Sequence, residues 1–283
     1  MKDEGETQVI VERGGSADSH EWFKYNYSTC HDENRFTYPG QRFRYNYKPF
    51  PPVLMYLNDI VEQFTACELT VATDRLPAIN AIITDFKRRL GWKNVHGIWE
   101  DFLDMQLLWR TNNDGNEASR IGSAIRLPIA PTWSWASVQM PVKYEFWPDR
   151  RPVFSADVKL DAQSKTVLCL TKPLIQLVVS TSEDGWEDDW GLAERPSQTH
   201  SIRDIQVTVD IPAEAEGETL YFIALYWCDT KRADRVEGGG LLLIRSFKVD
   251  GAYQRCGVVG VELRRRRPGP LFANEETVSI RIV

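Results

Sequence analysis

The sequence contains no long apolar run. No stretch of its 283 residues approaches the roughly 20 consecutive apolar residues that a membrane-spanning helix requires. Residues 1–6 (MKDEGE) are acidic and polar, so they do not resemble a secretory signal peptide. From these two absences we expect a cytoplasmic protein that makes no membrane contact, with a nuclear location as the alternative.

The chain also lacks an excess of positive charge. The chain has 34 lysine and arginine residues against 40 aspartate and glutamate residues, which gives a formal net charge of −6. Proteins that bind nucleic acids usually carry a basic excess. The charge balance therefore argues against a nucleic-acid partner.

Cysteine is sparse and unpaired in sequence. No Cys-x-x-Cys pair occurs, which argues against the usual zinc motifs and against a disulfide framework. We expect reduced thiols, most of them buried, as in an intracellular protein. The five cysteines are Cys30, Cys67, Cys169, Cys228 and Cys256.

Residue patterns that form catalytic or cofactor sites are missing. The chain has no G-x-G-x-x-G turn, no Walker phosphate loop and no G-x-S-x-G around a serine. Cys30 and His31, followed by Asp32 and Glu33, come nearest to a metal or nucleophile cluster. Neighbouring side chains on an extended segment point apart, however. The sequence therefore predicts no metal site, no cofactor and no enzymatic activity.

The order of patterns along the chain predicts an α+β fold. A first segment rich in glycine, serine and acidic residues is followed by one with many aromatic rings, and then by apolar stripes at helical spacing. Eight strand-like runs with no helical pattern between them follow, which is typical of an antiparallel sheet. We expect a disordered leader (1–20), an aromatic-rich extended arm (21–52), a helical block (53–110), a polar loop (111–129) and an antiparallel β-sandwich or barrel-like domain (130–283).

Three apolar stripes define the predicted helical block, over residues 54–64, 79–90 and 98–109. The second helix is expected to begin after Asp74 as its N-cap and to end at Gly91. Its expected apolar face consists of Ile79, Ile82, Ile83, Phe86 and Leu90.

The strand predictions include one unusual segment. In residues 132–138, Trp133 and Trp135 stand two apart, so a strand would place both indoles on one face. Three consecutive glycines at 238–240 are expected to form a turn between strands. The predicted strands are residues 132–138, 153–160, 167–179, 202–211, 220–228, 241–249, 256–264 and 277–283.

Several stretches, in order, resemble motifs of fungal heterokaryon incompatibility (HET) domain proteins. Residues 74–79 (DRLPAI) are similar to a D-R/K-L-P-A-L-S-G segment of that family. Residues 97–109 (GIWEDFLDMQLLW) resemble its G-L-W…L-L-W element, and residues 130–138 (APTWSWASV) its A-P-S-W-S-W-A-S-V strand. Residues 240–244 (GLLLI) and 253–258 (YQRCGV) resemble its closing G-L-L-L and Y-x-R-I-G strands. The principal positions are Asp74, Arg75, Leu76, Pro77, Trp99, Leu108, Trp109, Pro131, Trp133, Ser134, Trp135, Ala136 and Ser137.

The resemblance covers only the accessory C-terminal part of that family. Its HET domain, the part associated with cell death, lies before these motifs, and segments like its D-A-L-C-I-D-Q and R-G-W-T-L-Q-E are absent here. The resemblance implies a non-enzymatic scaffold or regulatory region that takes part in self/non-self recognition and programmed cell death. Its implied partner is a HET-type effector domain or a related fungal protein. The chain would then be a truncated gene product, a natural fragment or a degenerate paralogue.

The motif tryptophans also have a purely structural interpretation. Trp99, Trp109, Trp133 and Trp135 could form one aromatic core that joins the helices to the sheet. Each large ring would bury much apolar surface there, and no step of this interpretation requires catalysis.

A rival function comes from residues 183–190 (EDGWEDDW). Paired carboxylates with neighbouring indoles occur in sugar-handling sites, so a carbohydrate-binding or glycoside-acting β-sandwich is the alternative. The simpler interpretation is a solvated acidic loop. The arginine run at residues 264–267 is either a phosphate or importin contact, or a charged strand end that discourages aggregation.

Overall fold

A computed structural model describes the chain in part. It gives side chains for residues 53–67, 69, 71–112, 125–144, 154, 158–178, 204–228, 235–264 and 276–283, and only the secondary structure for the remaining helix and strand residues. The chain divides into two compact units, Met1–Ile60 and Val61–Val283. From Val61 onward, helices and sheet belong to one unit.

The first unit contains two small antiparallel pairs. Strand β1 (Gln8–Glu12) pairs with β2 (Trp22–Asn26), and β3 (Phe36–Tyr38) pairs with β4 (Gln41–Phe43). Strand β1 lies within the predicted leader of residues 1–20, and its Val-Ile-Val run has high strand propensity. Helix α1 (Pro52–Ala66) begins in this unit and ends in the second.

The second predicted helix is present as α2 (Arg75–Leu90), entered through the short 3-10 helix η2 (Ala72–Asp74). Gly91 ends it at φ 72°, and its N–H donates to the carbonyl of Lys87. Asp74 makes no side-chain cap, because the chain enters through a 3-10 turn instead. The apolar face is narrower than predicted, since Ile82 is 41% exposed.

The third predicted helix is wrong. Residues 94–111 form strands β5 (Asn94–Val95) and β6 (Ile98–Trp99), the 3-10 helix η3 (Glu100–Phe102), a four-residue helix α3 (Leu103–Gln106) and strand β7 (Trp109–Thr111). The reason is the turn at His96 and Gly97, where φ is 51° and 85° and the Asn94 side chain accepts a hydrogen bond from the Gly97 N–H. Positive φ at both turn residues closes a tight hairpin, so Ile98 and Trp99 at the start of the stripe pair with β5 instead of opening a helix. Strand β7 pairs with β8 (Val142–Tyr144).

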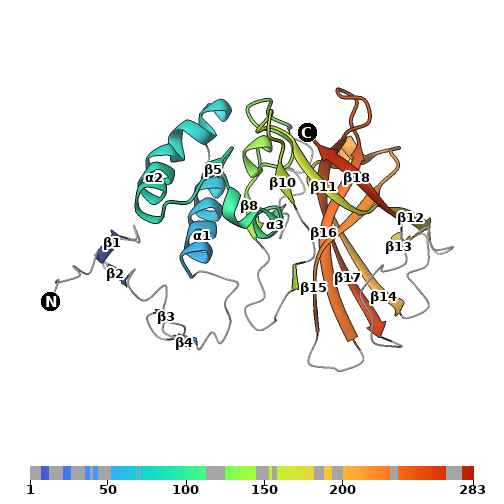
Figure 1. Ribbon diagram of the computed structural model, residues 1–283, viewed down its shortest axis with the longest axis horizontal. Helices are drawn as coiled ribbons and strands as arrows, with labels where there is room; N and C mark the ends of the chain where they lie inside the picture. The colour runs from blue at the N-terminus through green and yellow to red at the C-terminus, as the bar shows by residue number, and fades with distance from the viewer. Residues whose placement is uncertain are drawn as a thin grey trace. The chain divides into compact units, whose positions relative to one another are not determined.

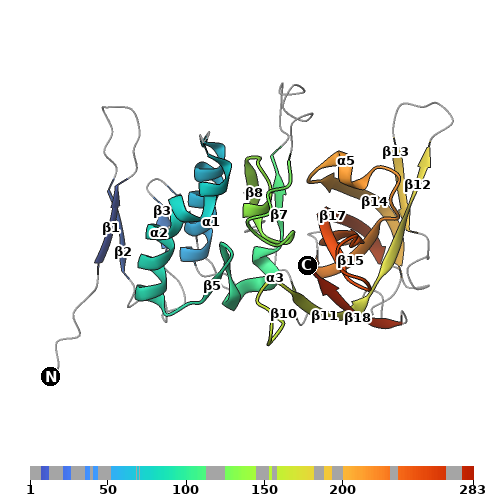
Figure 2. The same ribbon diagram turned by 90° about the horizontal axis from the view of Figure 1, so that it is seen from above.

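The rest of the described chain is dominated by one large sheet, so the α+β prediction is confirmed (Figures 1 and 2). Its order is β10-β11-β18-β17-β16-β15-β12-β13, with β14 on β17 and β9 on β15. Strands β11 and β12 stand at opposite ends of the order β11-β18-β17-β16-β15-β12, yet only Leu174 separates them along the chain. The sheet therefore curves back toward its first strand and is barrel-like. The pairing is antiparallel except for Tyr253 with Ile282. The strands are β9 (Val153–Phe154), β10 (Lys159–Leu160), β11 (Leu168–Pro173), β12 (Ile175–Thr181), β13 (Asp188–Leu192), β14 (His200–Val209), β15 (Tyr221–Asp229), β16 (Arg235–Arg245), β17 (Tyr253–Arg265) and β18 (Thr277–Ile282). A short helix, α5 (Pro212–Ala215), lies between β14 and β15.

Several strand boundaries differ from the prediction. The predicted strand at 167–179 is the pair β11 and β12, and that at 153–160 is the pair β9 and β10. The glycines at 238–240 form no turn but lie inside β16. A Cβ on Gly240 would lie 1.8 Å from the carbonyl oxygen of Ile223, so the glycine allows the close approach of β15 beside its bulge.

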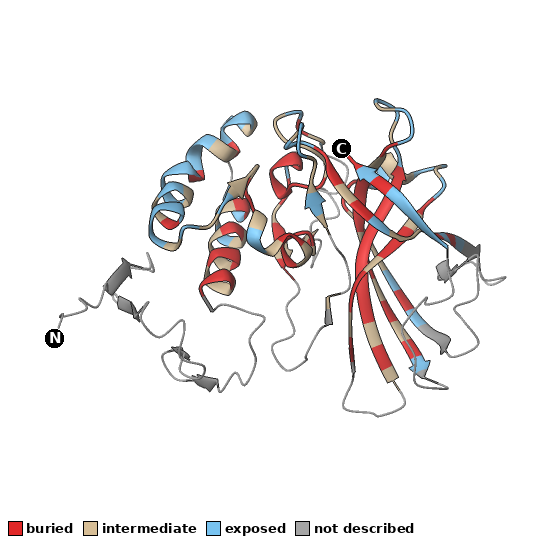
Figure 3. Ribbon diagram, viewed as in Figure 1, coloured by how far each residue is buried: buried red, intermediate tan, exposed pale blue. Residues whose placement is uncertain are grey.

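Strand β16 is buried on both faces, since residues 238–244 are all buried, and most of β15 and β17 beside it is buried or half-buried (Figure 3). Phe222 and Leu242 belong to a cluster that lies on one face, with further side chains from β12, β14 and β17. Ile223 and Leu241, on the opposite face, are equally inaccessible. A second layer therefore covers that face, and it includes Trp109 of β7, which contacts Arg255 of β17.

Candidate functional site

The segment 130–138 is not a strand. It turns at Thr132 and Trp133 and forms the 3-10 helix η4 (Trp135–Ser137). The Ser134 hydroxyl accepts a hydrogen bond from the Ala136 N–H at 3.0 Å, and the Ser137 hydroxyl donates to the Ser134 carbonyl at 2.7 Å. Serine side chains that bond nearby backbone favour turns over strands, which explains the incorrect prediction. Trp133, Ser134, Trp135, Ala136 and Ser137 are all fully buried.

This segment holds the β5–β6 turn. Trp135 Nε1 donates to the Gly97 carbonyl at 3.0 Å, and the Ser134 hydroxyl donates to the His96 carbonyl at 2.5 Å. A Cβ on Gly97 would lie 2.8 Å from the Trp135 ring. The His96 ring meets Trp133 edge to face at 5.7 Å, and burial lowers the pKa of this imidazole. Glycine at 97 is therefore required twice, for its backbone angle and for the indole beside it.

On helix α2, the motif residue that reaches this segment is Arg75. Its guanidinium lies 5.7 Å from the Trp135 ring centroid and donates to the Met140 carbonyl at 3.1 Å. Burial lowers the pKa of Arg75 to about 10. Asp74 and Pro77 are exposed and Leu76 is half-buried, so Arg75 is the buried residue of the D-R-L-P motif.

Trp109 and Trp133 continue the contacts toward the sheet. Trp109 Nε1 donates to the Trp133 carbonyl at 3.0 Å, and Trp133 Nε1 donates to the Thr166 carbonyl at 3.0 Å. The Arg255 guanidinium carbon lies 3.2 Å from the Trp109 ring centroid. Trp99 is buried too, but the ring contact that the structure gives it is with Trp92, at 6.0 Å. Pro131 and Leu108 are half-buried at the margins.

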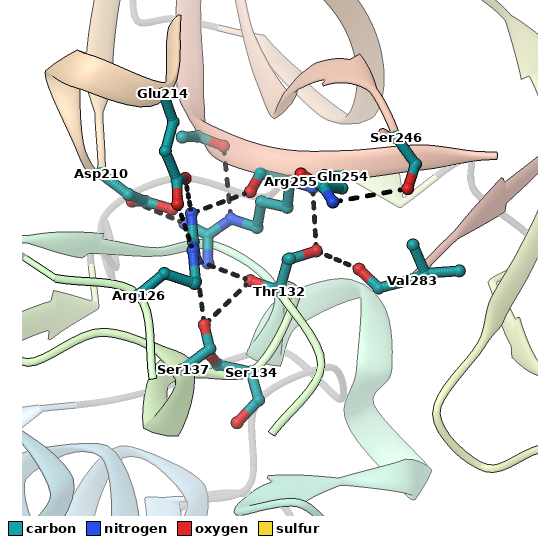
Figure 4. Close-up of polar contacts among 11 residues, drawn as sticks. Arg126, Thr132, Ser134, Ser137, Asp210, Glu214, Ser246, Gln254, Arg255 and Val283 are labelled. Carbon is teal, nitrogen blue, oxygen red and sulfur yellow. Dashed lines mark hydrogen bonds and ion pairs between the residues drawn. The ribbon is translucent and has the colours of Figure 1, made fainter. Parts of the chain in front are cut away.

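Arg126 binds three elements at once (Figure 4). Its Nε and Nη2 donate to the two carboxylate oxygens of Glu214 on α5, at 3.1 and 2.6 Å. Nη2 also donates to the carbonyl of Arg255 on β17, at 3.2 Å. Nη1 donates to the Thr132 carbonyl at 3.4 Å and to the Ser137 hydroxyl at 3.0 Å. We call segment 130–138 and its partners Arg75, Trp109, Arg126 and Arg255 the joint.

A buried ion pair lies beside Arg126. Arg255 Nη2 is 3.4 Å from Asp210 Oδ1, and both side chains are fully buried. Burial lowers the pKa of Arg255 to about 10 and raises the pKa of Asp210, although the Arg255 charge opposes the latter shift. With Arg126 and Glu214 the group contains two cations and two anions, so its charges cancel.

The chemistry open to the joint is limited by its hydrogen bonds. The Ser134 and Ser137 hydroxyls donate to carbonyl oxygens, and among the residues that the structure describes neither bonds to an imidazole nitrogen. No group of three or more metal-ligating side chains occurs among the residues that the structure describes. None of the helices described is both long and apolar enough to cross a membrane. What these contacts can do is connect layers of the fold, since the hydroxyl hydrogens are held by backbone carbonyl oxygens.

The other sequence candidates mostly fall outside the described residues. These include Cys30, His31, Asp32, Glu33 and Trp186. Of the arginine run, Arg264 is exposed on β17.

Three members of the joint's polar network were not anticipated: Arg126, Asp210 and Glu214. Arg126 stands alone between the apolar residues Ile125 and Leu127, a pattern that could have signalled a paired, buried charge. Asp210 and Glu214 carry no comparable sequence signal. Their partners lie 45 and 88 positions away along the chain.

No protein-family model, curated protein or solved structure matches this chain. The resemblance to heterokaryon incompatibility proteins therefore rests on the motifs themselves, and it stays a prediction.

Proposed function

We propose that this chain is a non-enzymatic scaffold or regulatory region of a fungal heterokaryon-incompatibility-type protein. The observation that carries the proposal is that motif stretches far apart in the sequence meet at the joint. Arg75, Gly97, Trp109, Trp135 and Arg255 come from four of those stretches and from five separate places in the fold. A role in holding layers together accounts for why these residue types occur as a set.

The burial of the motif residues favours architecture over catalysis. A group that acts on substrate must be reachable, whereas Trp133, Ser134, Trp135 and Ser137 are fully buried. A scaffold of this kind binds partners through other surfaces. The exposed side of α2 is such a surface, since Ala78, Ala81 and Ile82 are all exposed there. The proposed partner is a HET-type effector domain or a related fungal protein.

Expression in a fungal host tests the proposal. The chain alone should cause no cell death, and co-expression with a death-inducing HET domain should change the fraction of dead cells. Ile82→Asp should abolish that change, because it places a charge on the exposed apolar side of α2 without altering the core. Asn80→Asp, on the same helix and also exposed, is the matched control.

Two outcomes would contradict the proposal. Strong cell death from the chain alone would refute the non-enzymatic scaffold. An unchanged response to the effector, with the chain folded and expressed, would refute the proposed partner.

A further inference from the structure

Four buried polar atoms near the joint have no hydrogen-bond partner among the residues that the structure describes. They are Thr111 Oγ1, Tyr144 OH, Asp210 Oδ2 and Arg255 Nη1. Buried polar atoms in native proteins are nearly always paired, with protein or with ordered water. Four such atoms on side chains at or beside the joint therefore require an explanation.

The β7–β8 pairing brings these atoms to one side. Trp109 lies opposite Tyr144, and Thr111 lies opposite Val142. Opposite residues share a face of an antiparallel pair, and so do residues two apart on one strand. Thr111 and Tyr144 therefore lie on the same face as Trp109, the ring on which Arg255 stacks and whose carbonyl Arg255 Nη2 also binds.

The Arg255–Asp210 pair is incomplete in a specific way. A guanidinium and a carboxylate can form two parallel hydrogen bonds. Here one arm is present, Nη2 to Oδ1 at 3.4 Å, and the atoms of the other arm, Nη1 and Oδ2, are both unpartnered. A water molecule can accept from the first, donate to the second and still make further hydrogen bonds.

We propose that an ordered internal water molecule bridges Arg255 Nη1 and Asp210 Oδ2, and that the hydroxyls of Thr111 and Tyr144 complete its hydrogen bonds. The site goes beyond the proposed function and does not depend on it. It makes the contact between the β7–β8 pair and β17 partly hydrated. The buried charges of Arg255 and Asp210 are then solvated inside the fold.

A crystal structure of the full chain at a resolution that shows water tests the site directly. We expect a density peak about 2.7–3.2 Å from both Arg255 Nη1 and Asp210 Oδ2, the ordinary hydrogen-bond range. A second direct contact between the two side chains would overturn the proposal. So would another side chain of the protein in that position.

Urea unfolding of two conservative variants is an independent test. Water-bound hydroxyls and bare hydroxyls predict changes of opposite sign in the unfolding equilibrium constant. If the hydroxyls bind the water, Thr111→Val and Tyr144→Phe should each raise the unfolding equilibrium constant about fivefold to tenfold. Because both bind one molecule, the double variant should lose less than the product of the two single effects. If the hydroxyls are bare, their removal should lower the constant, which would refute the proposal.

Thr171→Val is the matched control. Thr171 lies on β11 and is exposed, so its replacement should change the unfolding constant by no more than about twofold. Circular dichroism should show the same spectrum for every variant.

Discussion

Replacement of Trp135 is the perturbation to which the fold should be most sensitive. The side chain is fully buried. It binds the Gly97 carbonyl, contacts Phe64 edge to face at 6.1 Å and lies beneath the Arg75 guanidinium. One residue thus connects the end of α1, the start of α2 and the β5–β6 turn.

The magnitude follows from burial. A buried aromatic side chain covers about 150–250 Å², which at about 25 cal/mol per Å² corresponds to about 4–6 kcal/mol. Measured losses for a buried aromatic replaced by alanine are about 3–5 kcal/mol. Trp135→Ala should therefore lower the free energy of unfolding by about 4 kcal/mol. For a unit of this size that corresponds to a fall in Tm of about 8–16 °C.

Two further variants separate the contributions. Trp135→Phe keeps most of the ring but leaves the Gly97 carbonyl unpaired, so it should cost about 2 kcal/mol. Phe247→Ala removes an aromatic side chain that is 72% exposed, and its effect should stay within about 0.5 kcal/mol. Urea unfolding followed by circular dichroism measures all three. An unchanged midpoint for Trp135→Ala would refute the buried placement of this indole.

Three other perturbations test neighbouring contacts. Gly97→Ala should cost about 2–4 kcal/mol in urea unfolding, because the methyl group would meet the Trp135 ring at a positive φ; a neutral effect would contradict the turn. Arg126→Met should cost about 2–3 kcal/mol by the same assay, since it removes the ion pair with Glu214 and leaves carbonyl acceptors unpaired. A loss below about 0.5 kcal/mol, the usual limit for surface positions, would show that the contacts of Arg126 are dispensable. The lowered pKa of His96 makes the folded state bind its proton less readily than the unfolded state, whose value is about 6.5. The contribution of His96 to the free energy of unfolding is therefore complete above about pH 6.5, and it declines as the pH falls toward the pKa of the folded state. Thermal melts should show a weaker decline for His96→Asn, which tolerates the positive φ; an identical pH profile would contradict the assignment.

Local patterns predicted much of the fold. Helix α2 follows its apolar spacing and ends at Gly91, because a glycine in the left-handed region satisfies the last turn. Strands β14, β15, β17 and β18 lie close to their predicted ranges, because their apolar runs are short and bounded by turn residues.

The failures occurred where a single residue overrides the local pattern. The hairpin that turns at Gly97 takes Ile98 and Trp99, the first residues of the third apolar stripe, into strand β6, and Ser134 turns a strand-like segment into a 3-10 helix. Gly240 sits in a strand, where close backbone approach rather than a turn requires it. In each case the deciding contact comes from another segment or from a side chain that competes for backbone hydrogen bonds.

The motifs singled out several residues that are buried, but they did not indicate what these residues contact. The resemblance singled out Arg75, Trp109 and Trp135, and these are buried at the joint. Arg126 and Asp210 could not be found from spacing, because their partners are brought near only by the folded topology. The ion pairs of the joint are therefore a property of the tertiary structure.

The most direct test of the central claim asks whether the joint makes helix α2 and the sheet one cooperative unit. Native-state hydrogen exchange over a urea series would compare amides in the middle of α2 with amides in β16. We expect both sets to exchange through the same global opening in the unaltered protein, with the same denaturant dependence. Opening of α2 well before β16 would contradict the claim that the joint unites them.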